Sequence, residues 1–394
     1  MRDVYLVGAG QSDFGAFPDE TYRSLFATAV EAALEASPPS IDREAIEEAY
    51  VGTLGVGGRQ LGLSAPAATE AAGLHGVPST RIENACAASG FAARSAVQAV
   101  RSGMADVAIA GGHEVMTDLS SDVTPYWLGV SGEMEWERLS GTTFAGVYGQ
   151  LASAHAAEHG TTVEQLSRVA VKNHRHGAMN EHAHLGFECS LEDAMAAPTV
   201  ADPLTLYHCC PTTDGAAAVI LASEDVLQGT TGPHVRVAGV GAASDRVGLF
   251  QRETFTSIPA SRTAGDRAFE MAGWGPGRVD HAEVHDCFSI AELVAYEDLG
   301  FCEPGESGAL IESGETALGG DRPVNTSGGL KSKGHPIGAT GAGQLVECFL
   351  QLTDEAGRRQ VDGARRSIAH NVGGSGGAAV VHALERVDEP GVGA

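Results

Sequence analysis

Cysteine and histidine side chains stand in short motifs where they could act as a nucleophile and its base. Cys86 follows Asn84, a good helix N-cap, so the sequence predicts that this cysteine lies in the first turn of a helix ending at Gly103. The unpaired N–H groups and the positive dipole end of such a turn favour a thiolate over a thiol. A lone cysteine is otherwise a small buried hydrophobe, so its role depends on whether the fold brings it partners.

Three other segments carry candidate partners. His335 precedes Pro336 in the glycine-rich run 325–343, where proline suits the first turn of a helix. His285 and Cys287 belong to the run His-Asp-Cys-Phe, which follows the apolar strand 282–284. The run 370–374, His-Asn-Val-Gly-Gly, ends in a glycine turn whose N–H groups could stabilise an oxyanion. A cysteine and a histidine brought together form an activated nucleophile pair, so these segments point to nucleophilic catalysis.

No metal site is predicted. His155 and His159 are one helical turn apart, a spacing that can bind a metal, but no glutamate follows His155 as in a His-Glu-x-x-His motif. The remaining histidines and cysteines of this region show no ligand pattern, and adjacent cysteines make poor joint ligands. We therefore expect solvated helix residues at His155, His159, His174, His176, His182, His184, His208, Cys209 and Cys210.

The elements that must position these residues alternate between strands and helices. An apolar strand over 4–7 runs into a glycine-rich turn, but Asp13 stands where a dinucleotide-binding fingerprint needs its third glycine. Apolar residues at helical spacing predict a helix over 21–35, and a strand over 49–53 and a helix over 64–72 follow. This alternation predicts an α/β layered domain with a mainly parallel sheet.

The chain also contains a predicted internal duplication. Residues 214–222 and 376–384 are near copies, and the strands 106–112 and 366–374 form a second matched pair, each preceded by a helix of small residues. The first copy is split by an insertion. We predict an N-terminal half at 1–116 and 213–232, an insertion (loop) domain at 117–212, and a C-terminal half at 233–394. Equivalent loops of such halves meet around a pseudo-two-fold axis, which would place Cys86 opposite His335.

Composition narrows the class of protein. A chain of 394 residues with 43% hydrophobic residues is globular and long enough for two core-forming domains. The net charge of −26 argues against nucleic-acid binding. It fits a protein kept soluble in concentrated salt, although a high-GC genome would also explain why only three lysines occur. Seven scattered cysteines, no signal peptide and no membrane-spanning run predict a cytoplasmic protein with reduced thiols.

Taken together and in this order, the runs NACAASG, HDCF, GHPIGATG and HNVGG resemble the thiolase superfamily over essentially the whole chain. The resemblance is to the branch of archaeal acetoacetyl-CoA thiolases and sterol-carrier-protein-type thiolases. It implies an α/β thiolase fold, in which duplicated βαβαβαββ halves form a five-layered αβαβα core with an insertion (loop) domain. Better-known thiolases carry NEAF in place of HDCF, and a catalytic cysteine where this chain has Asn371.

The resemblance also implies roles for the site residues. Cys86 would take the acyl group, and His335 would deprotonate it and then help to hold the oxygen of the second acetyl-CoA. His285 would join His335 in that oxyanion hole, and Cys287 would move the proton to or from the α-carbon. The backbone N–H groups of Cys86 and Gly373 would form the other oxyanion hole. Coenzyme A contacts are uncertain; Ser244, Arg246 and Arg252 are the candidates.

The implied function is that of an acetyl-CoA C-acetyltransferase, feeding mevalonate and isoprenoid synthesis. Coenzyme A and acetyl-CoA would be substrates, with no permanently bound cofactor or metal. A 3-ketoacyl-CoA thiolase of β-oxidation, a ketosynthase and a non-catalytic acyl-CoA-binding or scaffolding subunit are the alternatives. The expected partners are further copies of the chain, as a homodimer or tetramer. A hydroxymethylglutaryl-CoA synthase bridged by a small zinc-ribbon/OB-fold protein is a further possible partner.

Overall fold

A mixed β-sheet of nine strands runs through the computed structural model, which describes residues 2–120 and 122–390. The outermost residues of the predicted halves, 1 and 391–394, lie outside the described residues. The strand order is β3-β2-β4-β7-β1-β8-β11-β10-β9. The strands are β1 (Val4–Gln11), β2 (Glu48–Gly52), β3 (Ser79–Ile82), β4 (Val107–Glu114), β7 (Gly215–Ser223), β8 (His234–Ser244), β9 (His281–Glu283), β10 (Arg366–Gly373) and β11 (Ala378–Val387).

The duplication is visible in the order and direction of the strands. The run β2-β4-β7-β1 in the first half matches β9-β10-β11-β8 in the second: the first two strands of each run are parallel and all later neighbours are antiparallel. Val324 bridges Ala282 in parallel, just as β3 pairs with β2. The prediction of a mainly parallel sheet is therefore wrong. Strand β11 returns beside β10 through a short turn, and β7 re-enters the sheet at the end of β4 after the inserted segment. A strand that returns from the same end as its neighbour forms an antiparallel pair.

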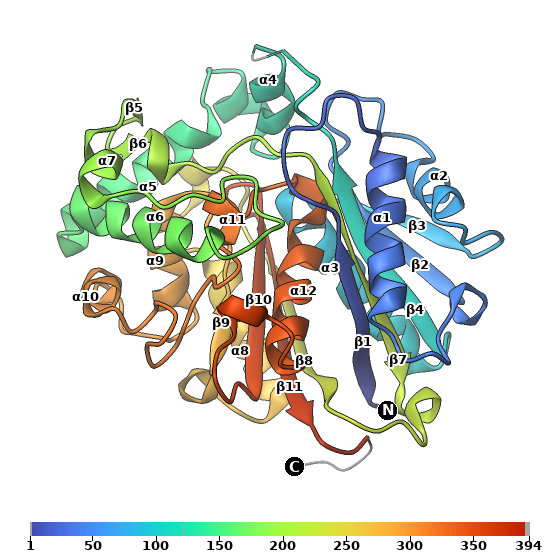
Figure 1. Ribbon diagram of the computed structural model, residues 1–394. Coiled ribbons are helices and arrows are strands. Elements are labelled where there is room, and N and C mark those ends of the chain that lie inside the picture. The colour runs from blue at the N-terminus through green and yellow to red at the C-terminus, as the bar shows by residue number, and fades with distance from the viewer. Residues whose placement is uncertain (1, 121, 391–394) are drawn as a thin grey trace.

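Helices cover both faces of each half and fill the space between them (Figure 1). Small residues of α3 and α12 pack together with the inner faces of both halves, so these two helices form the middle layer. The outer layers are α1 and α2 on the first half and α8 and α9 on the second. In the described part of the chain no helix is both long and apolar enough to cross a bilayer. The α-helices of the two halves are α1 (Tyr22–Glu35), α2 (Ser64–Ala71), α3 (Ala88–Ser102), α8 (Pro259–Ala272), α9 (Ser289–Asp298), α10 (Ser307–Ser313), α11 (Gly329–Ser332) and α12 (Thr340–Leu352).

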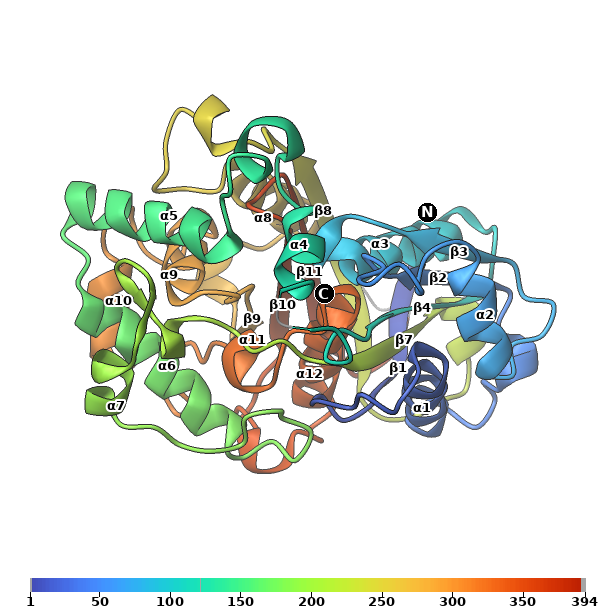
Figure 2. The same ribbon diagram turned by 90° about the horizontal axis from the view of Figure 1, so that it is seen from above.

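The segment between β4 and β7 leaves and re-enters the sheet at one point, because Glu114 pairs with Gly215. Its helices α5 and α6 pack on the C-terminal half, beside α9 and α10 (Figure 2). The residue boundaries given above for the insertion and the two halves stay a prediction. The elements of this segment are α4 (Thr124–Gly129), α5 (Phe144–His159), α6 (Val163–Gly177), α7 (Leu191–Ala196), β5 (Thr199–Ala201) and β6 (Leu204–Thr205).

Several histidines of this segment are buried rather than solvated, which corrects the sequence-based expectation. Each buried imidazole has a hydrogen-bond partner: His176 Nδ1 lies 3.0 Å from the Asn325 carbonyl, and His208 Nε2 lies 2.8 Å from the Ser167 hydroxyl. A helix that packs both on its own segment and on the C-terminal half has little surface left for solvent. The periodicity of its sequence does not reveal the contact with the C-terminal half. The buried histidines are His155, His174, His176 and His208.

Candidate active site

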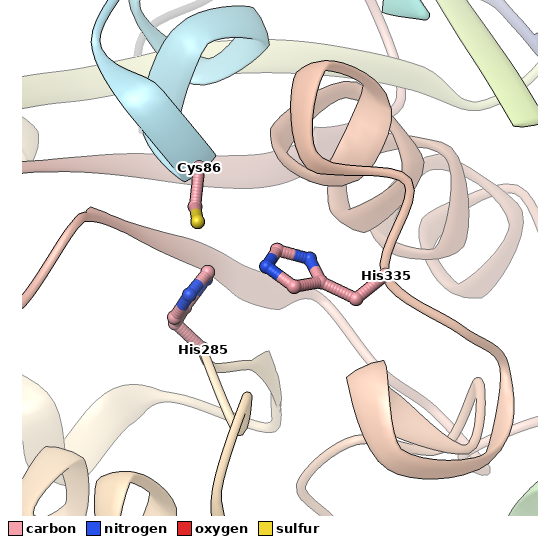
Figure 3. A group of neighbouring side chains, drawn as sticks. All are labelled: Cys86, His285 and His335. Carbon is pink, nitrogen blue, oxygen red and sulfur yellow. The ribbon is translucent and has the colours of Figure 1, made fainter. Parts of the chain in front are cut away.

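Four segments that are distant in sequence meet at one end of the strands. The turn η2 (Ala85–Ala87) carries Cys86 after β3, and His285 follows β9. His335 precedes the turn η8 (Ile337–Ala339), and the run 371–374 ends β10. The thiol and the two imidazoles point toward a common centre (Figure 3), with ligand-capable atoms all within 4.8 Å of one another. The duplicated halves thus place the two helix starts face to face at the carboxyl ends of parallel strands, where α/β proteins bind ligands.

The backbone before Cys86 differs from the predicted helix start. Asn84 makes no side-chain cap, and Ala85 has φ +50°, a left-handed conformation that is rare for alanine. The chain therefore turns sharply through a single 3₁₀ turn before α3 begins at Ala88. Gly373 is required beside this turn, because the Asn84 carbonyl oxygen lies 2.4 Å from where a Cβ would stand. Cys86 is consequently held at a tight corner between β3, α3 and the end of β10.

Cys86 is a neutral thiol at rest, contrary to the expected thiolate. Burial raises its pKa to about 12, although its own N–H and that of Gly374 act in the opposite direction. The surroundings are apolar, since Cys86 packs with Leu54, Met116 and Ile337. A single turn of helix offers too small a dipole to offset this loss of hydration. Reaction at this sulfur therefore needs a base that removes the proton.

His335 is arranged to be that base. Its Nδ1 lies 2.6 Å from the Thr340 hydroxyl oxygen, and that hydroxyl donates its only hydrogen to the Pro336 carbonyl at 3.0 Å. Because the hydroxyl must then accept from the imidazole, Nδ1 carries the proton and Nε2 is left as a free acceptor. Burial lowers the pKa of His335 to about 3, so the ring is neutral at physiological pH.

His285 forms the other side of the centre. Its ring lies at 81° to that of His335, with centroids 5.2 Å apart. Burial and the neighbouring imidazoles of His335 and His370 hold its pKa well below the usual range, so it too is neutral. Its Nδ1 lies 3.3 Å from the amide nitrogen of Asn371, and its buried Nε2 has no hydrogen-bond partner. An unpartnered buried nitrogen at a reaction centre is available to a substrate.

A pocket of about 400 Å³ opens onto Cys86 and His335, whereas the buried His285 is not among its lining residues. Its floor contains Cys86, Cys287 and His335, and its walls come largely from the segment between β4 and β7, including Leu128 and Phe144. Cys209 and Cys210 also line it, a placement that sequence analysis missed; only their nearness in sequence to other polar residues could have drawn attention to them. The pocket is largely apolar, which suits an acyl chain.

Cys287 is held from two sides. Its carbonyl accepts the Cys210 N–H at 3.0 Å, and the next residue, Phe288, stacks on the Tyr148 ring at 4.6 Å. Burial and the nearby Cys86 raise the pKa of the Cys287 thiol, while a hydrogen bond from Tyr148 acts in the opposite direction. The Tyr148 hydroxyl also lies 3.2 Å from the Gly374 carbonyl. Cys287 is therefore a protonated thiol at rest.

The contacts to coenzyme A stay a prediction. Ser244 ends β8, and neither it nor Arg246 nor Arg252 lines the pocket; the two arginines bond instead to backbone carbonyls of their own loop. The N–H group lying against the Cys86 sulfur belongs to Gly374 rather than to Gly373. The role of Gly373 in an oxyanion hole stays a prediction.

Two groups in the described residues have donor sets that suit a borderline metal such as Zn²⁺. One is the centre formed by Cys86, His285 and His335. The other joins His155 and His159 to Glu297 of α9, a glutamate that no local motif could reveal. In that second group His155 Nε2 already contacts the Glu297 carboxylate at 3.3 Å, and its Nδ1 lies 2.6 Å from the Thr161 hydroxyl. The contact between His155 and Glu297 joins α5 to α9, and it accounts for the grouping of these side chains without a cation.

Comparison with protein families matches both halves of the chain. A model described as "Thiolase, N-terminal domain" matches residues 4–225, and one described as "Thiolase C-terminal domain-like" matches residues 241–386.

Individual proteins are similar over almost the full length. The chain is 44% identical to an acetyl-CoA acetyltransferase of Methanothermobacter thermautotrophicus, covering 98% of this chain and 100% of that protein. It is 39% identical to the enzyme of the same name from Methanocaldococcus jannaschii, over 98% and 99% of the two chains. Sterol carrier protein 2 of Rattus norvegicus is 36% identical over 96% of this chain and 71% of its own. A solved structure titled "Ltp2-ChsH2(DUF35) aldolase" shares the fold, with a TM-score of 0.83, 22% identity and 97% of each chain covered.

Proposed function

Because this chain belongs to the thiolase family and is an acyltransferase enzyme, we propose that it is an acetyl-CoA C-acetyltransferase acting through an acetyl-Cys86 thioester. The observation that carries the proposal is the meeting of a buried thiol, an acceptor imidazole and a second imidazole with a free nitrogen at one centre beside an apolar pocket. Coenzyme A and acetyl-CoA are the substrates.

In the cleavage direction, Cys86 attacks the 3-carbonyl carbon of acetoacetyl-CoA. His335 Nε2 takes the thiol proton as the sulfur attacks, which fits a neutral imidazole beside a neutral thiol. Backbone N–H groups at the sulfur, those of Cys86 and Gly373 or Gly374, stabilise the tetrahedral oxyanion.

Breaking the bond between C2 and C3 leaves acetyl-Cys86 and the enolate of acetyl-CoA. His285 and the now protonated His335 hold the enolate oxygen, and Cys287 gives its proton to C2. The raised pKa of the Cys287 thiol supports this role, because the group is protonated at rest. Coenzyme A then gives its thiol proton to the Cys287 thiolate and takes the acetyl group from Cys86, and the Cys86 thiolate recovers its proton from His335. The reverse sequence is the Claisen condensation.

The decisive experiment compares thiolysis of acetoacetyl-CoA with that of a long-chain 3-ketoacyl-CoA, in high salt. We expect the short substrate to be preferred, because two relatives that match almost the whole chain are named acetyl-CoA acetyltransferases. Preference for the long substrate would favour a β-oxidation thiolase instead. Cys86→Ser should abolish cleavage, and a wild-type protein that cleaves neither substrate contradicts the catalytic proposal.

The wider setting is also a proposal. Condensation is thermodynamically uphill, so a synthetic thiolase in a mevalonate route gains from a partner that consumes its product. A hydroxymethylglutaryl-CoA synthase, bridged by a small zinc-ribbon/OB-fold protein, is the partner we propose in the cytoplasm. Purification from the native cell that recovers only a homo-oligomer of this chain would rule out a stable complex.

A further inference from the structure

Asn371 lies between the nucleophile and the second imidazole. Its side-chain nitrogen donates to the Cys86 carbonyl at 3.0 Å and lies 3.3 Å from His285 Nδ1. Its side-chain oxygen has no hydrogen-bond partner. That oxygen fits between α3 and α12 only because Gly90 and Gly341 lack side chains: their Cβ atoms would lie 2.7 Å and 2.3 Å from it. Two helices thus make room for an amide whose oxygen bonds to nothing.

The orientation of this amide follows from its partners. The Cys86 carbonyl can only accept a hydrogen bond, so the group facing it must be the amide nitrogen and not the oxygen. The second hydrogen of the same nitrogen is directed to His285 Nδ1. A ring nitrogen that accepts a hydrogen bond carries no proton, so in the neutral ring the proton must be on Nε2.

We propose that Asn371 is a positioning residue that fixes the tautomer of His285, so that its unpartnered Nε2 carries the proton and can donate to a substrate oxygen. The two imidazoles of the site then differ in which ring nitrogen carries the proton. Thr340 makes His335 Nε2 an acceptor, which serves a base, and Asn371 makes His285 Nε2 a donor, which serves an enolate oxygen. This inference rests on the proposed function, because it assigns the partner of that same oxygen.

The same tautomer keeps the site free of metal. Cys86, His285 and His335 have the donor set of an open Zn²⁺ site, but a protonated ring nitrogen cannot ligate. An acceptor in place of the Asn371 nitrogen would draw the proton to Nδ1 and release the lone pair of Nε2. Carboxylates behind histidine ligands act in this way in zinc proteins.

Asn371→Asp, almost identical in shape, is therefore the test. We expect kcat for acetoacetyl-CoA cleavage to fall by about 10²–10³, as for loss of an oxyanion donor, with a much smaller change in KM. We also expect Zn²⁺ alone, titrated against a chelating indicator, to bind about 10–100-fold more tightly than to wild type. Adding Cys86→Ala to the variant should remove that gain. A merely structural role for Asn371 predicts no gain in Zn²⁺ affinity.

Asn180→Asp is the matched control, because Asn180 is a buried amide that donates to the Ser327 carbonyl at 2.8 Å and contacts no imidazole. It should not gain Zn²⁺ affinity. A folded Asn371→Asp protein without that gain overturns the proposal. If this variant does not fold, Asn371→Ala decides: a fall in kcat of less than about tenfold overturns the proposal and a larger one supports it. Failure of the proposed function would appear separately, as inactive wild type, and leaves the Zn²⁺ comparison valid.

Discussion

At Cys86 two opposing effects act on the thiol. N–H groups of Cys86 and Gly374 favour the thiolate, and burial disfavours it; burial prevails and the pKa rises to about 12. The enzyme therefore does not store a reactive anion, which would also be exposed to oxidation. It keeps a neutral thiol beside a neutral base, so the proton moves only when substrate is in place. Removal of the Cys86 proton therefore depends on the tautomer of His335, which leaves Nε2 free to accept it.

Thr340→Val tests that detail, because it removes the hydroxyl that holds His335 Nδ1 and keeps the shape of the side chain. Without its partner the ring can carry the proton on either nitrogen, and the buried Nδ1–H has no acceptor. We expect kcat for acetoacetyl-CoA cleavage to fall by about 10–100-fold. Steady-state kinetics at saturating coenzyme A measures this.

Thr353→Val is the matched control at the other end of the same helix, where the hydroxyl bonds only to backbone carbonyls and Glu355. It should leave kcat within about twofold, since surface changes of this kind have small effects. Equal losses in the two variants would mean that Thr340 supports the helix and not the imidazole.

The sequence predicted the reactive residues but not the residues that govern them. Cys86, His285 and His335 stand at the starts of elements, where local signals such as a glycine turn or Pro336 are strong. The contact between Asn371 and Cys86 spans 285 positions and depends on how the two halves pack. Tautomers, likewise, follow from side-chain contacts such as that of Thr340, which no spacing in the chain reveals.

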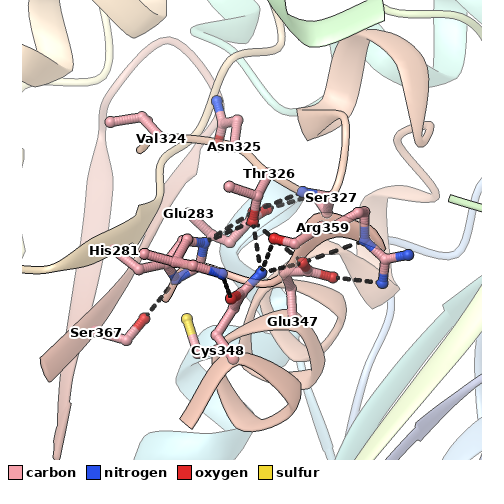
Figure 4. A network of polar contacts seen from close by, with 12 residues as sticks. His281, Glu283, Val324, Asn325, Thr326, Ser327, Glu347, Cys348, Arg359 and Ser367 are labelled. Carbon is pink, nitrogen blue, oxygen red and sulfur yellow. Dashed lines mark hydrogen bonds and ion pairs between the residues drawn. The ribbon is translucent and has the colours of Figure 1, made fainter. Parts of the chain in front are cut away.

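A buried polar network supports the elements behind the site (Figure 4). It connects β9, the segment 324–327 that leads to the loop of His335, and α12. His281 bonds to the Thr326 hydroxyl at 2.8 Å, and Thr326 bonds to the Glu347 carboxylate at 3.1 Å. Although burial opposes its ionisation, Arg359 holds the pKa of Glu347 below the usual range. The network thus fixes the base of the His335 loop on the helix that follows it.

Glu347→Ala should be strongly destabilising, because it leaves the Arg359 guanidinium buried and unpaired. We expect the free energy of unfolding to fall by about 3–5 kcal/mol, the usual cost of breaking a buried ion pair from one side. Urea denaturation at neutral pH measures the change. Glu355→Ala, an exposed position just beyond the same helix, should cost less than about 0.5 kcal/mol. A similar loss of unfolding free energy in both variants would show that the buried ion pair stabilises the protein no more than an exposed side chain does.

At the scale of elements, the sequence predicted most strands of the large sheet and the helices α1, α2 and α3 within a few residues, and the duplication with them. It failed for the histidines of the segment between β4 and β7. The helical periodicity of α6 predicts one buried face, whereas α6 is covered from further sides by α7, α9, α10 and α11. Burial of that kind depends on a neighbour from the other half of the chain. The direction of β11 was likewise set by a short return turn, not by strand pattern.

The whole molecule should be sensitive to mild acid, because many imidazoles are buried and neutral. Burial lowers the pKa of six of them to about 3: His113, His176, His208, His335, His370 and His382. The unfolded chain binds protons at a pKa of about 6.5, so it takes up more protons than the folded protein as pH falls. The stability that these neutral imidazoles contribute is therefore fully present above about pH 6.5 and is lost as the pH falls below it.

Each such imidazole costs on the order of 1 kcal/mol one pH unit below 6.5, so the six together would remove several kcal/mol at about pH 5.5. That is comparable with the whole stability of many proteins. We expect the urea midpoint to fall steeply between about pH 6.5 and 5. His382→Gln should lower the proton uptake on unfolding by about one at pH 5. A urea midpoint that does not change over this range would contradict the prediction.

The charged surface of the molecule consists of carboxylates and arginines. All three lysines, Lys172, Lys331 and Lys333, are buried, where they bond to Glu292 or to backbone carbonyls. The net charge of −26 is therefore opposed on the surface by arginine and little else. Such a surface repels itself, and salt relieves the repulsion by shortening the Debye length from about 10 Å at 0.1 M to about 3 Å at 1 M.

Raising KCl from about 0.1 M to 2 M should increase the melting temperature by roughly 5–10 °C, because the native state gains more from screening than the expanded unfolded chain. Differential scanning calorimetry at pH 7.5, above the range in which the histidines titrate, measures the shift. Sorbitol at equal osmolality is the control, since it acts through exclusion from the surface and does not screen charge. An equal rise in sorbitol would assign the effect to exclusion. No rise in KCl would show that the acidic surface is not an adaptation to salt.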